Sequence, residues 1–181
     1  MATRVALSWL VTPAVPLISW MTQRYISHHR ARLMPASNPI DPKKRLPLKE
    51  FFPQEVLEQT RVIRATVPNP KFYALVVILG INGVLDMSSI GAITFVDLIA
   101  YPERMTRSTL FHELVHVVQY RVLGLRRFAS LYVNGFLKGG GYEGIPLEKQ
   151  AFELEERFTR NPNRVFSVEE DVVQREKAGR L

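Results

Sequence analysis

The segment 111–122 constrains the fold more than any other part of the chain. Its apolar residues recur every three or four positions, which is typical of an amphipathic helix with one buried face. The residues of this stripe are Phe111, Leu114, Val115, Val118 and Val122. Thr106 and Ser108 are candidate N-terminal caps and Gly124 is a candidate stop, so we expect a helix that ends near Leu123.

His112, Glu113 and His116 form the pattern HELVH on this predicted helix. Because the two histidines are four residues apart, their imidazoles project from one face and can reach the same tetrahedral metal ion. Glu113 lies about 100° further round the helix, where it can take a proton from water rather than bind the ion. Zinc lowers the pKa of its water to about 7, so the pattern predicts a site for one zinc ion that activates water. An ordinary helix with two solvated histidines is the alternative interpretation.

A zinc site of this kind needs a third protein ligand. The chain has no cysteine, and the other two of its four histidines, His28 and His29, lie far upstream. The longer pattern HExxHxxGxxH is excluded, because Gln119 and Val122 stand where it requires glycine and histidine. We therefore expect a downstream carboxylate to complete the site.

Glu148 is the preferred third ligand, because it lies in the first turn of a helix predicted to begin at Pro146. The inward stripe of that helix contains Leu147, Ala151, Leu154 and Phe158. The small side chain of Ala151 would let this helix approach the HELVH helix closely. The other candidate carboxylates are Glu143, Glu153, Glu155 and Glu156. Glu155 and Glu156 are more easily interpreted as part of a solvated face.

The rest of the pattern predicts an α+β domain over residues 53–181, with strands first and packed helices afterwards. The expected strands are 61–67, 72–79 and 92–100, the last of which is rich in β-branched and aromatic residues. The run 72–79 is also compatible with a buried helix. The expected helices, besides the HELVH helix, are 53–59, 127–137, a helix from Pro146 and a short terminal helix.

Residues 1–52 are predicted to form a separate arm and linker. Residues 1–50 hold eight Lys and Arg against two acidic residues, a net charge of +6, which leaves the rest of the chain nearly neutral. A nucleic-acid-binding domain would carry its charge on the folded surface, so no nucleic acid partner is expected. Five prolines in 34–53 predict an extended linker.

The apolar run 5–21 is slightly short for a bilayer span, and Pro13 and Pro16 are expected to break a helix there. One interpretation is a membrane-surface anchor, with Trp9 and Trp20 at the headgroup level and nearby arginines facing anionic lipid. A targeting segment, or a segment that packs on the domain itself, are the alternatives.

Three stretches resemble small gluzincin-type zinc metallopeptidases, of the minigluzincin or DUF4157-like kind. They are AITFVDLIAYPE (92–103), STLFHELVHVVQY (108–120) and GYEGIPLEKQAFELE (141–155), and only HELVH is highly specific. The resemblance implies a small zincin-like domain with a short antiparallel or mixed sheet followed by packed helices. It further implies that His112, His116 and Glu148 are ligands, that Glu113 is the general base, and that strand 92–100 pairs with an extended substrate.

The chain departs from this family in two respects. Longer gluzincins carry an aspartate four residues after the ligand glutamate, where it orients a ligand histidine, and here that position is Phe152. No motif marks the group that stabilises the oxyanion. Tyr142, beside the glycines 139–141, is preferred for that role, and Tyr120 and Tyr132 are alternatives.

The sequence therefore predicts a zinc-dependent hydrolase, a metallopeptidase that acts on a peptide or protein substrate. The alternative is a non-catalytic zinc-binding module, associated with a membrane and used for interaction or regulation. In either case residues 1–33 are the segment expected to contact a membrane surface, which would make the protein membrane-associated.

Overall fold

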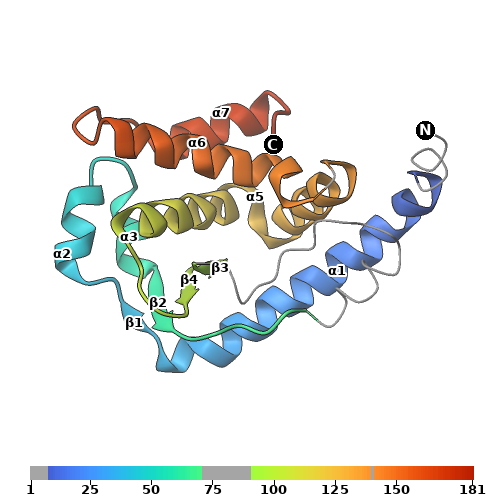
Figure 1. Ribbon diagram of the computed structural model, residues 1–181, viewed down its shortest axis with the longest axis horizontal. Coiled ribbons are helices and arrows are strands. Elements are labelled where there is room, and N and C mark those ends of the chain that lie inside the picture. Colours follow the sequence, from blue (N-terminus) through green and yellow to red (C-terminus); the bar gives the residue numbers. More distant parts are fainter. Residues whose placement is uncertain (1–7, 71–90, 140) are drawn as a thin grey trace.

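A computed structural model describes residues 8–70, 91–139 and 141–181 of the chain. Figure 1 shows a small sheet between helices α1 (Ser8–Leu33) and α5 (Arg107–Gly139), with α6 (Pro146–Arg160) and α7 (Val168–Lys177) on the other side of α5. Helix α5 contacts each of the other three. The predicted α+β fold, a short mixed sheet followed by packed helices, is confirmed.

The sheet has four short strands in the order β1-β2-β4-β3. They are β1 (Asn38–Pro39), β2 (Arg61–Arg64), β3 (Ile93–Phe95) and β4 (Leu98–Tyr101). Strands β2 and β4 are parallel, and the two outer pairings are antiparallel. Strand β3 therefore lies at one end of the described sheet. The predicted strand 72–79 lies outside the described residues.

The prediction of one continuous strand over 92–100 is wrong, because this segment is a hairpin of β3 and β4. The chain turns at Val96, whose φ of 64° lies in the left-handed region that β-branched residues rarely adopt. The next residue, Asp97, accepts two hydrogen bonds from Arg30 of α1, at 2.5 and 2.7 Å. A tertiary contact thus accompanies a turn that the local sequence disfavours.

Helix α5 contains the HELVH segment and is broken at the residue predicted to end it. Gly124 has φ 72° and ψ 155°, which no helix allows, and the chain continues as a second helical stretch to Gly139. Thr106 caps the first stretch, because its hydroxyl accepts a hydrogen bond from the Thr109 amide at 3.0 Å. The ring of Phe111, fully buried on the predicted stripe, stacks on Phe158 of α6 with 4.4 Å between ring centroids.

Helix α1 runs through Pro13 and Pro16, so the predicted break is wrong. Packing along its length opposes the local cost of the prolines. Val15 and Ile18 are buried in a cluster with Val133 of α5. The described helices include none that is both long enough and apolar enough to cross a lipid bilayer.

The prediction of an extended linker over 34–53 is also wrong. This segment forms β1, helix α2 (Pro42–Arg45) and the short 3-10 helices η1 (Met34–Ala36) and η2 (Leu46–Leu48), followed by α3 (Gln54–Gln59). Its apolar side chains enter the same core as α5, and they are Ile40, Leu48, Phe51 and Phe52. Burial of these side chains outweighs the extended preference of a proline-rich sequence.

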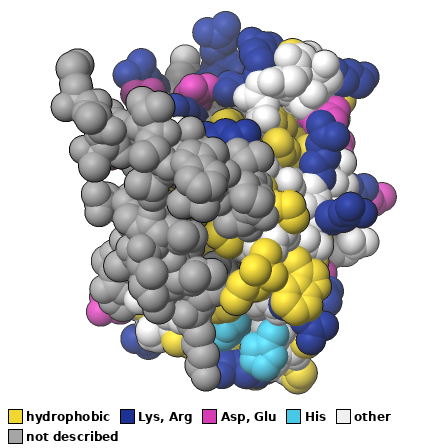
Figure 2. Space-filling view, turned by 90° about the vertical axis from the view of Figure 1, so that its right-hand side faces the viewer, with side chains coloured by type: hydrophobic (Ala, Val, Ile, Leu, Met, Phe, Trp, Pro, Cys, Tyr) yellow, Lys and Arg dark blue, Asp and Glu magenta, His cyan; other side chains and the backbone are white. Residues whose placement is uncertain are grey.

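One face of the molecule exposes apolar side chains beside basic ones. Figure 2 shows hydrophobic side chains gathered on the side of the molecule where α1 begins, with Lys and Arg around them. Among the described residues, Leu17 and Trp20 of α1 are 54% and 58% exposed. Arg24 follows one turn later and is also exposed. The outward side of α1 thus changes from apolar to basic along its length.

Candidate metal centre

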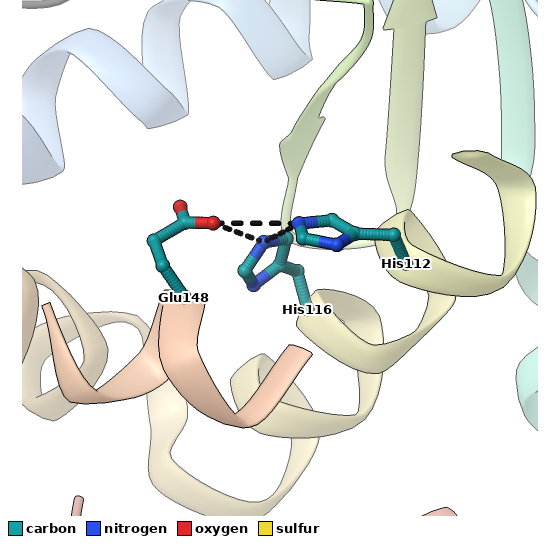
Figure 3. A group of neighbouring side chains, drawn as sticks. All are labelled: His112, His116 and Glu148. Carbon is teal, nitrogen blue, oxygen red and sulfur yellow. Dashed lines mark hydrogen bonds and ion pairs between the residues drawn. The ribbon is translucent and has the colours of Figure 1, made fainter. Parts of the chain in front are cut away.

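Three side-chain atoms from helices α5 and α6 lie within 3.3 Å of one another. The Nε2 atoms of His112 and His116 are 3.2 Å apart, and each lies 3.3 Å from Oε2 of Glu148. Figure 3 shows the two rings and the carboxylate pointing toward one another. All three residues are buried, and together they could hold a metal ion.

The size of this triangle fits a tetrahedral transition-metal site. With metal–ligand bonds of about 2.0–2.1 Å, neighbouring ligands around a tetrahedral zinc ion are about 3.3–3.4 Å apart. Two imidazoles and one carboxylate form a known donor set for zinc, whereas magnesium and calcium prefer oxygen ligands throughout. The donor atoms therefore favour a transition metal over magnesium or calcium.

Close packing of α6 on α5 brings Glu148 to the histidines. Leu147 and Ala151, its neighbours on the inward face, are fully buried. Gly135 of α5 allows the start of α6 to approach, because a Cβ there would lie 2.6 Å from the Cδ of Pro146. The predicted ligand in the first turn of this helix is thus positioned by apolar contacts on both sides.

The other ring nitrogens of the two histidines face hydrogen-bond acceptors. Nδ1 of His112 lies 3.1 Å from Oε2 of Glu155, and Nδ1 of His116 lies 2.8 Å from Oε1 of Gln119. The amide nitrogen of Gln119 donates to the Leu147 carbonyl and to Gln150, at 2.9 and 3.0 Å, which fixes its oxygen as the acceptor. Both Nδ1 atoms therefore carry a proton and donate it outward.

The protonation of both Nδ1 atoms determines what can lie between the two Nε2 atoms and Oε2 of Glu148. When Nδ1 of a neutral imidazole is protonated, Nε2 presents a lone pair. Two such lone pairs and a carboxylate oxygen converge at 3.2–3.3 Å, and three acceptors at that distance repel one another. A cation or a proton between them removes the repulsion, so the site is built to hold positive charge.

The pKa values of the three residues follow from the same geometry. Burial alone lowers the pKa of His112, but hydrogen bonds to Glu148 and Glu155 outweigh it and raise the pKa to about 10. Burial alone raises the pKa of Glu148, but the charge of His116 and the two imidazole hydrogen bonds hold it well below its ordinary value. Both directions favour a positive charge between the imidazoles and the carboxylate.

Glu113 lies beside the cluster but outside the ligand set. Its Oε2 accepts a hydrogen bond of 2.6 Å from the Thr94 hydroxyl, which extends from β3. Burial raises the pKa of Glu113, and the opposing attraction of His116 and His112 only partly offsets this. A carboxylate with a raised pKa is better suited to accept and release a proton near neutral pH.

The predicted tyrosine lies at the site. The hydroxyl of Tyr142, in the 3-10 helix η4 (Tyr142–Gly144), donates to Oε2 of Glu148 at 2.6 Å. Burial and the negative charge of Glu148 raise the pKa of Tyr142, so the hydroxyl keeps its proton and remains a donor. Tyr120 is buried nearby, where its ring stacks on Phe128 with 3.7 Å between centroids.

Sequence reasoning missed Glu155 and Gln119, which accept hydrogen bonds from the outer ring nitrogens of the two histidines. The sequence favours a solvated face for Glu155, yet Glu155 lies seven residues after Glu148 on the same side of α6 and contacts His112. Glu155 therefore supplies the carboxylate that orients His112, and Phe152 supplies no polar group there. In the sequence Gln119 stands out only because it departs from the pattern HExxHxxGxxH. Its spacing of three residues from His116, on one helix face, was the available signal.

No protein-family model, curated protein or solved structure matches this chain. The resemblance to small gluzincins therefore rests on the residues themselves, and membership of that family stays a prediction.

Proposed function

We propose that this protein is a zinc-dependent peptidase of the small gluzincin type. The observation that carries the proposal is the convergence of His112, His116 and Glu148 within 3.2–3.3 Å, with Glu113 buried beside them. A zinc ion held by these residues would act as a Lewis acid, which lowers the pKa of water to about 7 and polarises a carbonyl group.

Glu113 would transfer a proton from the attacking water to the leaving nitrogen. Its carboxylate accepts a proton from water, while the water oxygen forms a bond to the carbonyl carbon of the scissile peptide. The carbon–nitrogen bond then breaks, and the proton on Glu113 passes to the leaving nitrogen as the amine departs. Thr94 supports this cycle, because its 2.6 Å hydrogen bond holds the carboxylate in one orientation.

Tyr142 would stabilise negative charge on the carbonyl oxygen. Its protonated hydroxyl already lies among the ligands, where it donates to Glu148. A small rotation of this side chain would redirect the hydroxyl to a substrate oxygen. Its position beside the ligands supports a role in orienting either Glu148 or the substrate.

The test combines metal analysis with one conservative substitution. Purified protein is expected to contain about one zinc per chain and to cleave members of a fluorogenic peptide library. Glu113→Gln keeps the size of the side chain and should retain zinc but lose at least a thousandfold in kcat. Glu156→Gln, on an exposed glutamate of α6, is the matched control and should leave both unchanged.

Two results would count against the proposal. Full activity of Glu113→Gln would exclude it as the proton-transfer group, and absence of zinc would exclude the metal site. Stoichiometric zinc without cleavage of any peptide would support the non-catalytic zinc-binding module instead.

A further inference from the structure

A partly open cavity of about 360 Å³ extends from the candidate metal centre into the space between α1, β3 and α5. This volume lies within the range of about 300–1,000 Å³ that is usual for ligand pockets. One end is formed by the candidate ligands, Glu113 and Tyr142. The other walls are formed by α1, β3 and the part of α5 that follows Gly124, with Ile18, Ile26, Phe95, Phe128, Val133 and Phe136 among the lining residues.

Helix α1 is a fixed wall of this cavity. At its C-terminal end, Arg30 binds Asp97 through two hydrogen bonds of 2.5 and 2.7 Å. Nearer its N-terminal end, Ile18 packs in a buried cluster with Val133. Between these points Tyr25 lies against Phe95, with 6.0 Å between ring centroids. The cavity is therefore part of the folded structure.

The charged side chains among the described lining residues all lie at the metal end of the cavity. Among the described lining residues, the only acidic ones are Glu113, Glu148 and Glu155, and none is Lys or Arg. A charged ligand group placed deeper, against α1, would lose water without gaining a partner, which is costly. An apolar group placed there would instead be stabilised by leaving water.

Strand β3 adds a second property, because residues 91–95 line the same cavity. In the described sheet β3 is paired with β4, so an extended chain that paired with β3 would do so along its other edge. A peptide backbone requires hydrogen-bond partners of this kind, whereas an acyl chain requires none. The combination of strand edge and apolar wall favours a peptide ligand.

We infer that the substrate is a peptide with a bulky apolar side chain next to the scissile bond, and that this side chain fills the cavity between α1 and α5. The inference rests on the proposed peptidase function and adds a substrate class to it. Each buried methylene group is expected to change affinity about fourfold. A leucine peptide should thus exceed its alanine counterpart at least tenfold in kcat/KM.

The test uses peptides that differ only in leucine or alanine at one residue beside the scissile bond, on either side. Thr22→Phe on α1 would fill the cavity, because Thr22 lines it. This variant should lose at least tenfold in kcat/KM for the leucine peptide and keep its zinc and its rate with alanine. Ser27→Phe, on the exposed side of the same helix, is the control and should change neither.

A second variant guards against misfolding of the first. Val133→Ala enlarges the cavity, so the preference should move from leucine toward tryptophan. An unchanged leucine-to-alanine ratio in Thr22→Phe together with an unchanged leucine-to-tryptophan ratio in Val133→Ala would overturn the inference, even if zinc and cleavage are present.

A binding measurement separates this inference from the proposed function. The zinc-loaded Glu113→Gln protein should bind the leucine peptide at least tenfold more tightly than the alanine peptide, measured by fluorescence anisotropy. If the wild-type protein cleaves nothing but this difference persists, the cavity preference stands and hydrolysis fails. If alanine and leucine peptides are cleaved equally, hydrolysis stands and the cavity inference fails. Displacement of the leucine peptide by a palmitoyl amide more readily than by unlabelled peptide would also overturn it.

Discussion

Glu155 and Gln119 accept hydrogen bonds from the outer nitrogens of the two histidines and so control which ring nitrogen faces Glu148. Such supporting groups typically contribute a factor of about 10–100 to metal affinity. Their contacts, at 3.1 and 2.8 Å, lie on opposite sides of the centre. The centre therefore depends on five residues rather than three.

Replacing Glu155 by leucine should weaken zinc binding about 10–100-fold, because Nδ1 of His112 would lose its acceptor. Competition with a chromophoric chelator measures this affinity. Glu153→Leu is the control, since Glu153 instead pairs with Arg175 at 2.7 Å. Equal zinc affinity in the Glu155→Leu and wild-type proteins would show that the contact has no role in binding.

Tyr142→Phe distinguishes two roles of one hydroxyl. If the hydroxyl stabilises the oxyanion, its loss should lower kcat about 100–1,000-fold while zinc affinity stays within a few fold. If it only orients Glu148, zinc affinity should fall and kcat at saturating zinc should recover. We expect the first result, measured by steady-state kinetics over a range of zinc concentrations.

His29 should make stability depend on pH. Its ring stacks on Phe95, and burial, with Arg32 and His28 nearby, lowers the pKa of His29 below the ordinary value of 6.5. Below that value the unfolded chain binds a proton that the folded chain does not, so stability is present at neutral pH and falls as the pH falls.

His29→Phe retains an aromatic ring and cannot titrate. Its free energy of unfolding in urea should therefore fall less between pH 7 and pH 5 than that of the wild-type protein. Identical pH dependence in the two proteins would contradict the assignment.

At the scale of elements, sequence periodicity located the helices that follow the sheet well. Both parts of α5, the start of α6 at Pro146 and the carboxylate of Glu148 all follow from spacing and from caps, which are local properties. The hairpin of β3 and β4 could not be found in this way, since Val96 is a poor turn residue and its conformation accompanies a contact with α1. The buried segment 34–53 was missed for the same reason, because only distant partners show that it joins the core.

The break in α5 depends on a glycine. Gly124 has φ 72° and ψ 155°, a region that is essentially restricted to glycine. Gly124→Ala should lower the free energy of unfolding by about 1–3 kcal/mol through backbone strain. Steric overlap would not contribute, because a Cβ there meets no atom within 4 Å. Urea titration measures the change, and Arg126→Ala, an exposed neighbour, should have almost no effect.

At the scale of the whole molecule, α1 has two different sides. Its inner side lines the cavity, and its outer side exposes Leu17 and Trp20, followed by Arg24. This distribution supports the proposal that the helix contacts a membrane surface. A deletion of residues 1–33 would not test the proposal cleanly, because it would also remove a wall of the cavity.

Point substitutions on the exposed side of α1 test the proposed membrane contact instead. Leu17→Ser with Trp20→Ser should lower partitioning onto vesicles that contain phosphatidylserine about tenfold or more, since each side chain loses its apolar burial. Leu46→Ser is the control, because Leu46 is 66% exposed but lies on a different segment. Sedimentation with vesicles measures the binding, and equal partitioning of all three proteins would contradict a membrane role for α1.

The ion pair between Arg30 and Asp97 connects this helix to the chemistry. Asp97 occupies the turn three residues after Thr94, and the hydroxyl of Thr94 holds the carboxylate of Glu113. A displacement of α1 would therefore be passed to Glu113 through the Arg30–Asp97 ion pair, the turn at Val96 and the hydroxyl of Thr94. If α1 contacts a membrane and Glu113 transfers a proton as proposed, the two events would be coupled through these three contacts.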